Sequence, residues 1–523
     1  MTRFRFGMLA LVLLALAAAG TAMAAGEGDT LRFAIQAEPT SMDPHFAQML
    51  ANDALASHVF GVLVRKTNAM QYAPDLATSW KPLNDTTWEF KLRQGVKFHD
   101  GSPFTAEDVV FSIKRVPNVK GSPSPRTSRV APITEMKIVD PHTIQFVTKA
   151  PTPLLPKLLA EVYIVSSKAA QNADPEDFNK GKAAIGTGPY KFVERVPGDR
   201  IVLQRYEGYY GDKPDFAKVV FRPIKVPPAR VAALLAGDVD IIDNPPANDL
   251  PRLKADPKLQ VHAVEACRII YLHFDHREPS PQVKGTGGKN PFKDRRVRQA
   301  VNSAINRETI AQRIMGGLAT PASQMTSKTI FGHNPELKVD TYDPEGAKKL
   351  LAEAGYPNGF EVTLSTTNDR YINDSRVAET IAAMLARVGI KTNVDAMSQT
   401  LFFPRRSKEE FSFWMAGQGC GGGEGTHTLI NEIHSPDKKR GLGSNNTGGY
   451  ANAEIDRLID EILATMDETK RETLERKAAA MVKQDASAVP LHWEHTVWAA
   501  RKGVLYEGRV DQWNSALSAR RAK

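Results

Sequence analysis

Apolar and polar positions follow two different periods in the first part of the chain. Residues 86–98 alternate between apolar and polar side chains around Gly95, which predicts a hairpin with one buried face. Thr105 then matches a helix N-cap, and the acidic Glu107 and Asp108 stand in the first turn, where the helix dipole favours negative charge. The pattern predicts two strands followed by a helix.

The alternation of strands and helices continues to the end of the chain. Helices are predicted where apolar residues recur with a period of about 3.6 and glycine or proline marks an end, and strands where the period is about two. No linear repeat is visible, so we expect two α/β lobes, each a mixed sheet with covering helices. Strands are predicted from Leu31, twice within 186–211 around a Pro-Gly turn, and at 218–226, 360–366, 390–396 and 490–498; helices are predicted at 227–237, 295–317, 343–355 and 374–388.

The first 24 residues have the three parts of a secretory signal peptide. Two arginines precede an apolar run from Met8 to Ala19, and the small residues Ala22-Met23-Ala24 predict cleavage before Ala25. The run is shorter than the roughly 20 residues of a membrane-spanning helix, and no later stretch is apolar for that long. We therefore expect a soluble periplasmic protein, without a lipid anchor because no cysteine stands at the cleavage point.

Composition and charge narrow the class of protein. The 523 residues are 42% hydrophobic and 24% charged, which is typical of a globular protein, and the length predicts two or three domains. The formal charge of +9 does not predict nucleic-acid binding, because the chain is exported and its basic residues are spread out. Cys267 and Cys420 can pair in an oxidising compartment, but a domain of this size does not depend on a disulfide, so both states stay open.

Six stretches of the chain resemble one family in their order and spacing. They are SMDPH at 41–45, the segment 76–112, IGTGPYKF at 185–192, ALLAGDVDI at 233–241, RRVRQAVNSAINRETI at 295–310 and DPEGAKKLLAEAGY at 343–356. The resemblance is to the periplasmic solute-binding proteins of peptide, nickel and related ABC importers, extracellular solute-binding family 5. It implies an α/β, two-lobed periplasmic-binding-protein fold of class II type, with an additional small α/β domain inserted in the first lobe.

The resemblance also implies how the chain is divided. Ligand is enclosed between lobes that close about a hinge, and a cleft between domains is a common place for a pocket. We expect the chain to cross between the lobes near 267–274 and 485–490. The resulting boundaries are a signal peptide at 1–24, lobe I at 25–60, 183–272 and 488–523, an inserted domain at 61–182, and lobe II at 273–487.

Residues 417–427 read GQGCGGGEGTH and follow the predicted strand FSFWMA, where the family places a loop that faces the ligand. Peptide-binding members usually carry a Trp after the first glycine and then an Asp, whose carboxylate can pair with a free amino terminus. Here Gln418 replaces the Trp and a glycine replaces the Asp, which leaves Glu424 as the acid and resembles the glutathione-binding branch. We expect ligand contacts from Gln418, Gly419, Cys420, Gly421, Glu424 and His427, with the glycines letting backbone amides approach the ligand.

Two other interpretations of this loop have less support. A Walker-type phosphate loop needs a Lys after its glycines, and none follows here. Cys420, Glu424 and His427, with His434 further on, carry atoms that bind metals, but their spacing matches no short metal motif. No metal or cofactor is expected, and the alternative for these residues is a cysteine packed in the core and histidines facing solvent.

Six further residues are candidates for ligand contact. The family places Phe46, Tyr271, Phe274 and Trp414 toward the cleft, although each also fits a position in the core. Arg126 and Arg268 carry guanidinium groups, which bind carboxylates bidentately and suit a peptide-like acid. The alternative for Arg126 is an ion pair at the surface.

No catalytic set is visible in the sequence. His492 and His495 are three positions apart in an alternating strand, whereas a zinc protease of this type needs them four apart on a helix, and no G-x-S-x-G motif occurs. We therefore predict a monomeric, non-enzymatic protein that captures a small peptide or peptide-like solute and delivers it to an ABC permease. Glutathione, a nickel chelate or an oligosaccharide are alternative cargoes, ligand sensing is an alternative role, and a secreted hydrolase is the rival class.

Overall fold

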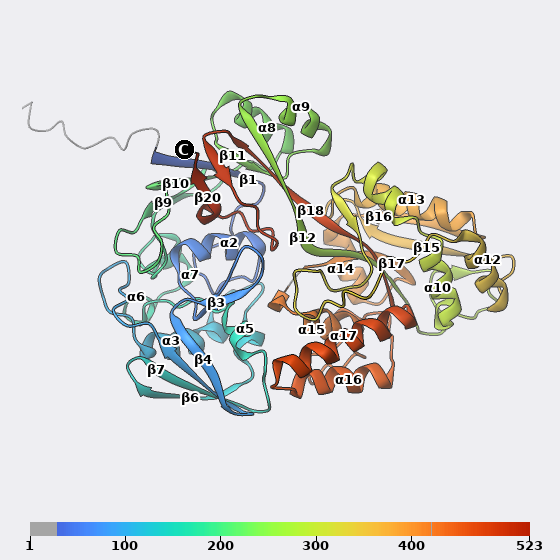
Figure 1. Cartoon of the computed structure of the whole chain (residues 1–523), viewed down its shortest axis with the longest axis horizontal. Helices are drawn as coiled ribbons and strands as arrows, with labels where there is room; N and C mark the ends of the chain where they lie inside the picture. Colours follow the sequence, from blue (N-terminus) through green and yellow to red (C-terminus); the bar gives the residue numbers. More distant parts are fainter. Residues whose placement is uncertain (1–28, 420, 523) are drawn as a thin grey trace, which may run out of the picture.

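A computed structural model describes residues 29–419 and 421–522, so the predicted signal peptide and Cys420 lie outside the described residues (Figure 1). In this part of the chain no helix is both long enough and apolar enough to cross a membrane. The described residues form one 12-stranded sheet in the order β13-β15-β17-β12-β18-β11-β1-β10-β9-β8, with β14 paired to β18 and β16 to β15. These strands are β1 (Thr30–Ile35), β8 (Tyr190–Val196), β9 (Arg200–Arg205), β10 (Lys218–Pro223), β11 (Ile241–Asp243), β12 (Leu259–Phe274), β13 (Val283–Lys284), β14 (Ala319–Pro321), β15 (Phe360–Thr367), β16 (Ile390–Met397), β17 (Phe413–Gln418) and β18 (Ala488–Arg501).

Two long strands carry this sheet from one lobe to the other. β12 and β18 pair antiparallel along their length, and in Figure 1 they run between the two halves of the molecule. Their register shifts between Glu265 and Ile269. The predicted crossings at 267–274 and 485–490 lie within or beside these two strands. A paired connection of this kind can act as the hinge between two lobes.

Lobe I is built on the half of the sheet from β11 to β8. β1 runs parallel to both β10 and β11, and its residues Leu31 and Phe33 lie in the lobe's core together with Leu55 of α2 (Leu50–Val59). Helix α8 (Pro227–Ala236) begins with proline and ends at Gly237, where a φ of 85° suits a residue without a Cβ. The C-terminal residues return to this lobe through β19 (Val504–Tyr506) and β20 (Ala519–Arg521).

The inserted domain has a sheet and a core of its own. Within the described residues its four strands are ordered β4-β5-β7-β6, and Phe90 and Phe146 lie in a core that α3 covers. The predicted hairpin at 86–98 is wrong: β5 pairs with β4 and β7, and Gly95 lies in the loop that follows β5. The strands and the longest helix of this domain are β2 (Val64–Lys66), β3 (Tyr72–Pro74), β4 (Ala77–Asn84), β5 (Thr87–Leu92), α3 (Ala106–Arg115), β6 (Ile133–Asp140) and β7 (Thr143–Thr148).

Lobe II covers its half of the sheet with helices on both faces. Val301, Leu364 and Ile381 belong to one core cluster, and a second cluster lies against α16 and α17. The predicted helix at 295–317 is interrupted, because α10 ends at Ser303 and Asn306 caps a new turn that starts at Arg307. The main helices are α10 (Arg295–Ser303), α12 (Pro344–Glu353), α13 (Asp374–Ala386), α14 (Gln399–Ser407), α16 (Ala453–Ala464) and α17 (Glu468–Asp485).

Candidate functional site

A cavity of about 400 Å³ lies between the two lobes. Lobe I contributes the residues that follow β1, the N-terminal part of α2 and the end of β11. Lobe II contributes the loop between β15 and α13, and the crossing strands contribute Arg268 and Glu494. Because β1 and β11 are parallel, their carboxyl ends meet at this edge of the sheet, where ligands of α/β proteins commonly bind.

The lobe I wall combines an apolar surface with one fixed acidic group. Leu50, Ala54 and Leu55 of α2 give the apolar part. Asp243 at the end of β11 is 1% exposed, its carboxylate lies 3.2 Å from Nε of Arg230, and it accepts a hydrogen bond of 2.7 Å from the Asn514 side chain. Burial raises the pKa of Asp243, and the charge of Arg230 opposes that rise. These contacts hold the carboxylate of Asp243 in place at the wall.

Arg268 and Glu494 form a buried pair that joins the crossing strands to both lobes. The Arg268 Nε lies 3.6 Å from Glu494 Oε2 and donates a hydrogen bond of 3.0 Å to Gln512. Glu494 Oε1 accepts a hydrogen bond of 3.0 Å from the backbone N–H of Ile372. Burial raises the pKa of Glu494 and lowers the pKa of Arg268, while each charge opposes the effect of burial on its partner. Arg268, a predicted site residue, therefore lies at the cavity but already has a carboxylate partner.

Arg370 is the cation at the cavity without such a partner. Its side chain is exposed, and within residues 29–419 and 421–522 its guanidinium makes no hydrogen bond or ion pair. It lies 5.7 Å from the ring centroid of Tyr371, and its backbone N–H donates a hydrogen bond of 3.2 Å to Asp374 at the start of α13. An unpaired guanidinium beside a partly neutralised arginine can bind an incoming carboxylate with two parallel hydrogen bonds.

The glycine loop lies at a different contact between the lobes. The Tyr72 hydroxyl donates a hydrogen bond of 2.7 Å to the carbonyl of Gly422, and the Gly422 N–H donates one of 3.3 Å to Glu161. Glu424 is buried and forms ion pairs with Lys157 and with Arg471. Its carboxylate is therefore neutralised by two cations of the protein, which compete with the predicted binding of a ligand's amino group.

The other predicted loop residues surround very little space. Gln418, Gly419, Gly421, Glu424 and His427 line a hollow of about 10 Å³, which is roughly the room needed for one water molecule. Burial lowers the pKa of His427 to about 4, so its imidazole is neutral near pH 7. The described residues contain no group of three or more His, Cys, Asp or Glu side chains that could hold a metal ion. Cys420 lies outside the described residues, so its ligand contact stays a prediction.

The predicted aromatic residues lie mostly in the core. Tyr271, Phe274 and Trp414 are at most 1% exposed, so they match the core alternative that the sequence left open. The Tyr271 hydroxyl donates a hydrogen bond of 2.6 Å to Glu432, and Trp414 stacks on His273 with 5.0 Å between ring centroids. None of the three lines the cavity between the lobes.

Phe46 and Arg126 lie where lobe I meets the inserted domain, away from the cavity. Phe46 is half-buried. Arg126 is 1% exposed, forms an ion pair with Asp53, and donates hydrogen bonds to the carbonyls of Pro44 at 3.1 Å and Glu161 at 3.2 Å. Its guanidinium is fully used in joining segments of the chain, as a buried rather than a surface ion pair.

Several cavity residues are absent from the predicted set. Asn244 directly follows β11, and Arg370 and Tyr371 lie three and four residues after the end of β15. Polar and aromatic residues at the carboxyl end of a buried strand are the signal that could have identified them. Periodicity says nothing about such residues, because they lie in loops.

Comparison with known proteins relates the whole chain to one group. The model of the bacterial extracellular solute-binding proteins, family 5 Middle, matches residues 71–437. The chain is 29% identical to heme-binding protein A of Haemophilus influenzae over 490 residues, covering 88% of this chain and 85% of that protein. It is 28% identical to the dipeptide-binding protein of Escherichia coli over 497 residues, covering 90% of each. The periplasmic binding protein DppA from Helicobacter pylori, solved in complex with the peptide STSA, is similar in structure with a TM-score of 0.76 and 26% identity, covering 94% of this chain and 98% of that one.

Proposed function

The chain belongs to the bacterial extracellular solute-binding proteins of family 5, and on that basis we propose that it captures a short peptide or peptide-like solute with a free carboxylate in the cavity between its lobes. The filled protein then presents this solute to the membrane permease of an ABC importer. Proteins of this family act in the periplasm, and the predicted signal peptide is the proposed route of export. The chain acts as a monomeric carrier and performs no reaction on its cargo.

The observation that carries this proposal is the unpaired Arg370 at a cavity between two lobes. The volume of about 400 Å³ falls in the range of about 300–1,000 Å³ that small-molecule sites occupy. Arg370 supplies the group that binds a carboxylate, while the apolar side chains of α2 face it from lobe I. The Escherichia coli relative is a dipeptide-binding protein, and the Helicobacter pylori relative was solved with the peptide STSA, which supports a peptide ligand.

The proposed closure of the lobes rests on the positions of Arg370 and of the apolar wall, which lie in different lobes. Arg370 belongs to lobe II and the apolar wall belongs to lobe I, so a ligand that contacts both binds the closed state more tightly than the open one. We place the hinge in β12 and β18, at the register shift near Glu265. In this proposal Arg268 is a positioning residue beneath the ligand, and the glycine loop is a contact between the lobes.

The experiment is a calorimetric titration of ligand-stripped mature protein with dipeptides and with the same dipeptides amidated at the carboxyl terminus. Arg370→Ala should weaken binding of the free acid by about 1.5–3 kcal/mol, the scale of a hydrogen bond to a charged group. The amide should bind weakly to both proteins. Arg376→Ala, which removes another exposed arginine of lobe II, is the control and should bind as the wild type does. Equal affinity for acid and amide in the wild type would contradict the role of Arg370, and binding only of glutathione, nickel chelates or sugars would replace the peptide cargo.

A further inference from the structure

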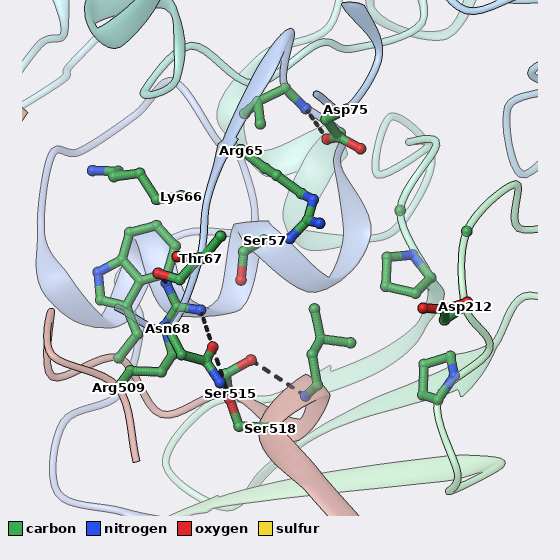
Figure 2. A pocket seen from close by; sticks show the side chains of 18 of the residues that line it. Ser57, Arg65, Lys66, Thr67, Asn68, Asp75, Asp212, Arg509, Ser515 and Ser518 are labelled. Atoms are coloured by element: carbon green, nitrogen blue, oxygen red, sulfur yellow. Dashed lines mark hydrogen bonds between the residues drawn. The ribbon is translucent and has the colours of Figure 1, made fainter. Parts of the chain in front are cut away.

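A second cavity, of about 920 Å³, lies beside lobe I and shares no lining residue with the cavity between the lobes (Figure 2). It is enclosed by the β2–β3 hairpin, the turn at 209–212, the end of α2 and the C-terminal segment 505–520. Its volume lies at the upper end of the range of about 300–1,000 Å³ for small-molecule sites. The cavity therefore has room for a small organic ligand.

Arg65 lines this cavity, and its side chain is exposed. In Figure 2 its side chain extends from β2 into the open space, between Ser57 and Asp212. Among the described residues its guanidinium makes no hydrogen bond or ion pair. The neighbouring cations differ in this respect, because Lys66 is paired with Glu161 at 2.9 Å and Arg509 with Asp511 at 2.6 Å.

Two more arginines at the cavity bond only to backbone carbonyls. The Arg93 Nε donates a hydrogen bond of 3.0 Å to the Asp75 carbonyl, and Arg520 Nη1 donates one of 2.9 Å to the Leu517 carbonyl. In residues 29–419 and 421–522 neither forms an ion pair with a carboxylate. The positive charge of Arg65, Arg93 and Arg520 is thus not neutralised by ion pairs.

The acidic residues that line the cavity form no ion pair with Arg65, Arg93 or Arg520 among the described residues. The Asp75 carboxylate is turned into the protein, where it accepts hydrogen bonds from the Tyr210 hydroxyl and, at 3.1 Å, from the Val62 N–H. Burial raises the pKa of Asp75, and the charges of Arg65 and Arg93 oppose that rise. Asp212 and Glu507 are exposed, so water and salt screen them.

The walls of the cavity carry aromatic rings. Tyr209 and Tyr210 lie with 4.7 Å between their ring centroids, and the Arg93 guanidinium lies 5.2 Å from the Tyr210 ring. Trp513 forms part of another wall, with the Arg509 guanidinium 5.1 Å from its ring. Rings of this kind can cover the apolar part of a ligand whose charged group is bound by an arginine.

We propose that this second cavity binds a small organic anion, a carboxylate or phosphate carried on an apolar or aromatic body, and that Arg65 is its anchoring residue. A guanidinium binds either anion with paired hydrogen bonds, so the chemistry at Arg65 is the same for both. The site is separate from the one proposed for the transported solute.

The two cavities share elements although they share no residue. Gln512 and Asn514 line the cavity between the lobes, whereas Trp513 and Ser515 line the second cavity. Helix α2 is divided in the same way, with Leu55 at the first cavity and Ser57 at the second. A ligand in the second cavity therefore contacts the segments that build the lobe I wall of the cleft.

The test is calorimetric titration of the ligand-stripped mature protein with phenyl phosphate, with phenylacetate and with the neutral 2-phenylethanol. We expect at least one of the two anions to bind and the alcohol not to bind. Arg65→Ala should weaken anion binding about tenfold or more, the scale of a lost hydrogen bond to a charged group. Arg65→Lys should restore only part of this affinity, because an ammonium lacks the bidentate fork.

Two control variants test whether the anion binds in the second cavity and not elsewhere on the protein. Arg376→Ala removes the same charge from an exposed position in lobe II, and Arg370→Ala removes the cation of the cleft between the lobes. Both should bind the anion within about twofold of the wild type, since both leave the second cavity intact. Failure of both anions to bind, equal binding in Arg65→Ala, or loss of binding in Arg370→Ala would each overturn the proposal.

Discussion

At the residue scale, the carboxyl group of Glu475 has a pKa far from its usual value. It is 1% exposed in α17, and burial, with the nearby charge of Glu424, raises its pKa to about 8. Its Oε1 accepts a hydrogen bond from the Thr426 hydroxyl, while Oε2 has no partner among the described residues. Glu475 is therefore protonated near pH 7 in the folded protein.

This shift predicts how stability depends on pH. Between about pH 4.5 and pH 8 the folded state holds a proton on Glu475 that the unfolded state has lost, so the free energy of unfolding should fall as pH rises through this window. The slope should reach about 1.4 kcal/mol per pH unit at most. Glu475→Gln keeps the neutral form at every pH and should be more stable than the wild type above pH 8. Urea denaturation from pH 5 to 9 measures this, with the exposed Glu468→Gln as control; parallel curves for wild type and Glu475→Gln would contradict the assignment.

At the element scale, the best predicted helix is α3, because its start is fixed by local chemistry. Thr105 accepts a hydrogen bond of 3.3 Å from the Glu107 N–H, and the Asp108 side chain accepts one of 3.0 Å from the Thr105 N–H. Thr105→Ala should lower the free energy of unfolding of the inserted domain by about 1 kcal/mol. Thr473→Ala, an exposed position inside α17, should cause little loss because alanine favours a helix interior. Thermal or urea unfolding measures both, and equal effects would exclude a capping role.

The elements also show which parts of the fold can be predicted from the sequence. Helix α8 follows local signals, because it begins with prolines and ends at Gly237. The hairpin predicted at 86–98 fails because strand pairing is not local: β5 finds partners on both sides, in β4 and in the distant β7. Alternation identifies a strand but does not say which strand lies next to it.

The candidate site is harder to predict than the elements for a related reason. Arg268 is recognised because it stands in an alternating strand that crosses between the lobes, and it does line the cavity. Arg370 stands in the loop after β15. Its role depends on the place of this loop at the cavity, and on the lack of an ion pair for its guanidinium among the described residues. Tyr271, Phe274 and Trp414 have the right residue types, but the faces of β12 and β17 that carry them are covered by helices.

At the scale of the whole molecule, the glycine loop of lobe II contacts the inserted domain, although the two are far apart in the sequence. Lys157 follows the inserted domain's sheet in sequence, and it forms an ion pair with Glu424 of lobe II. Its ammonium lies 4.5 Å from the Phe331 ring and 5.3 Å from the Tyr72 ring, which surround the pair with aromatic surface. The loop's glycines let the chain come this close: at Gly423 a Cβ atom would lie 2.4 Å from the Tyr72 hydroxyl.

This arrangement predicts that Lys157 sets the balance between open and closed forms. Lys157→Met removes the charge but keeps much of the side chain, and Glu424 keeps its partner Arg471 at 3.1 Å, so the fold should survive. We expect the open form to lack the Lys157–Glu424 contact, so the ligand-free Lys157→Met protein should shift toward the open form and bind its solute more weakly. Small-angle X-ray scattering should give a larger radius of gyration for ligand-free Lys157→Met than for the wild type, and saturating ligand should bring the two together. Lys168→Met, at an exposed lysine away from the loop, is the control. An unchanged radius in Lys157→Met would mean that closure depends on the cleft and the hinge alone.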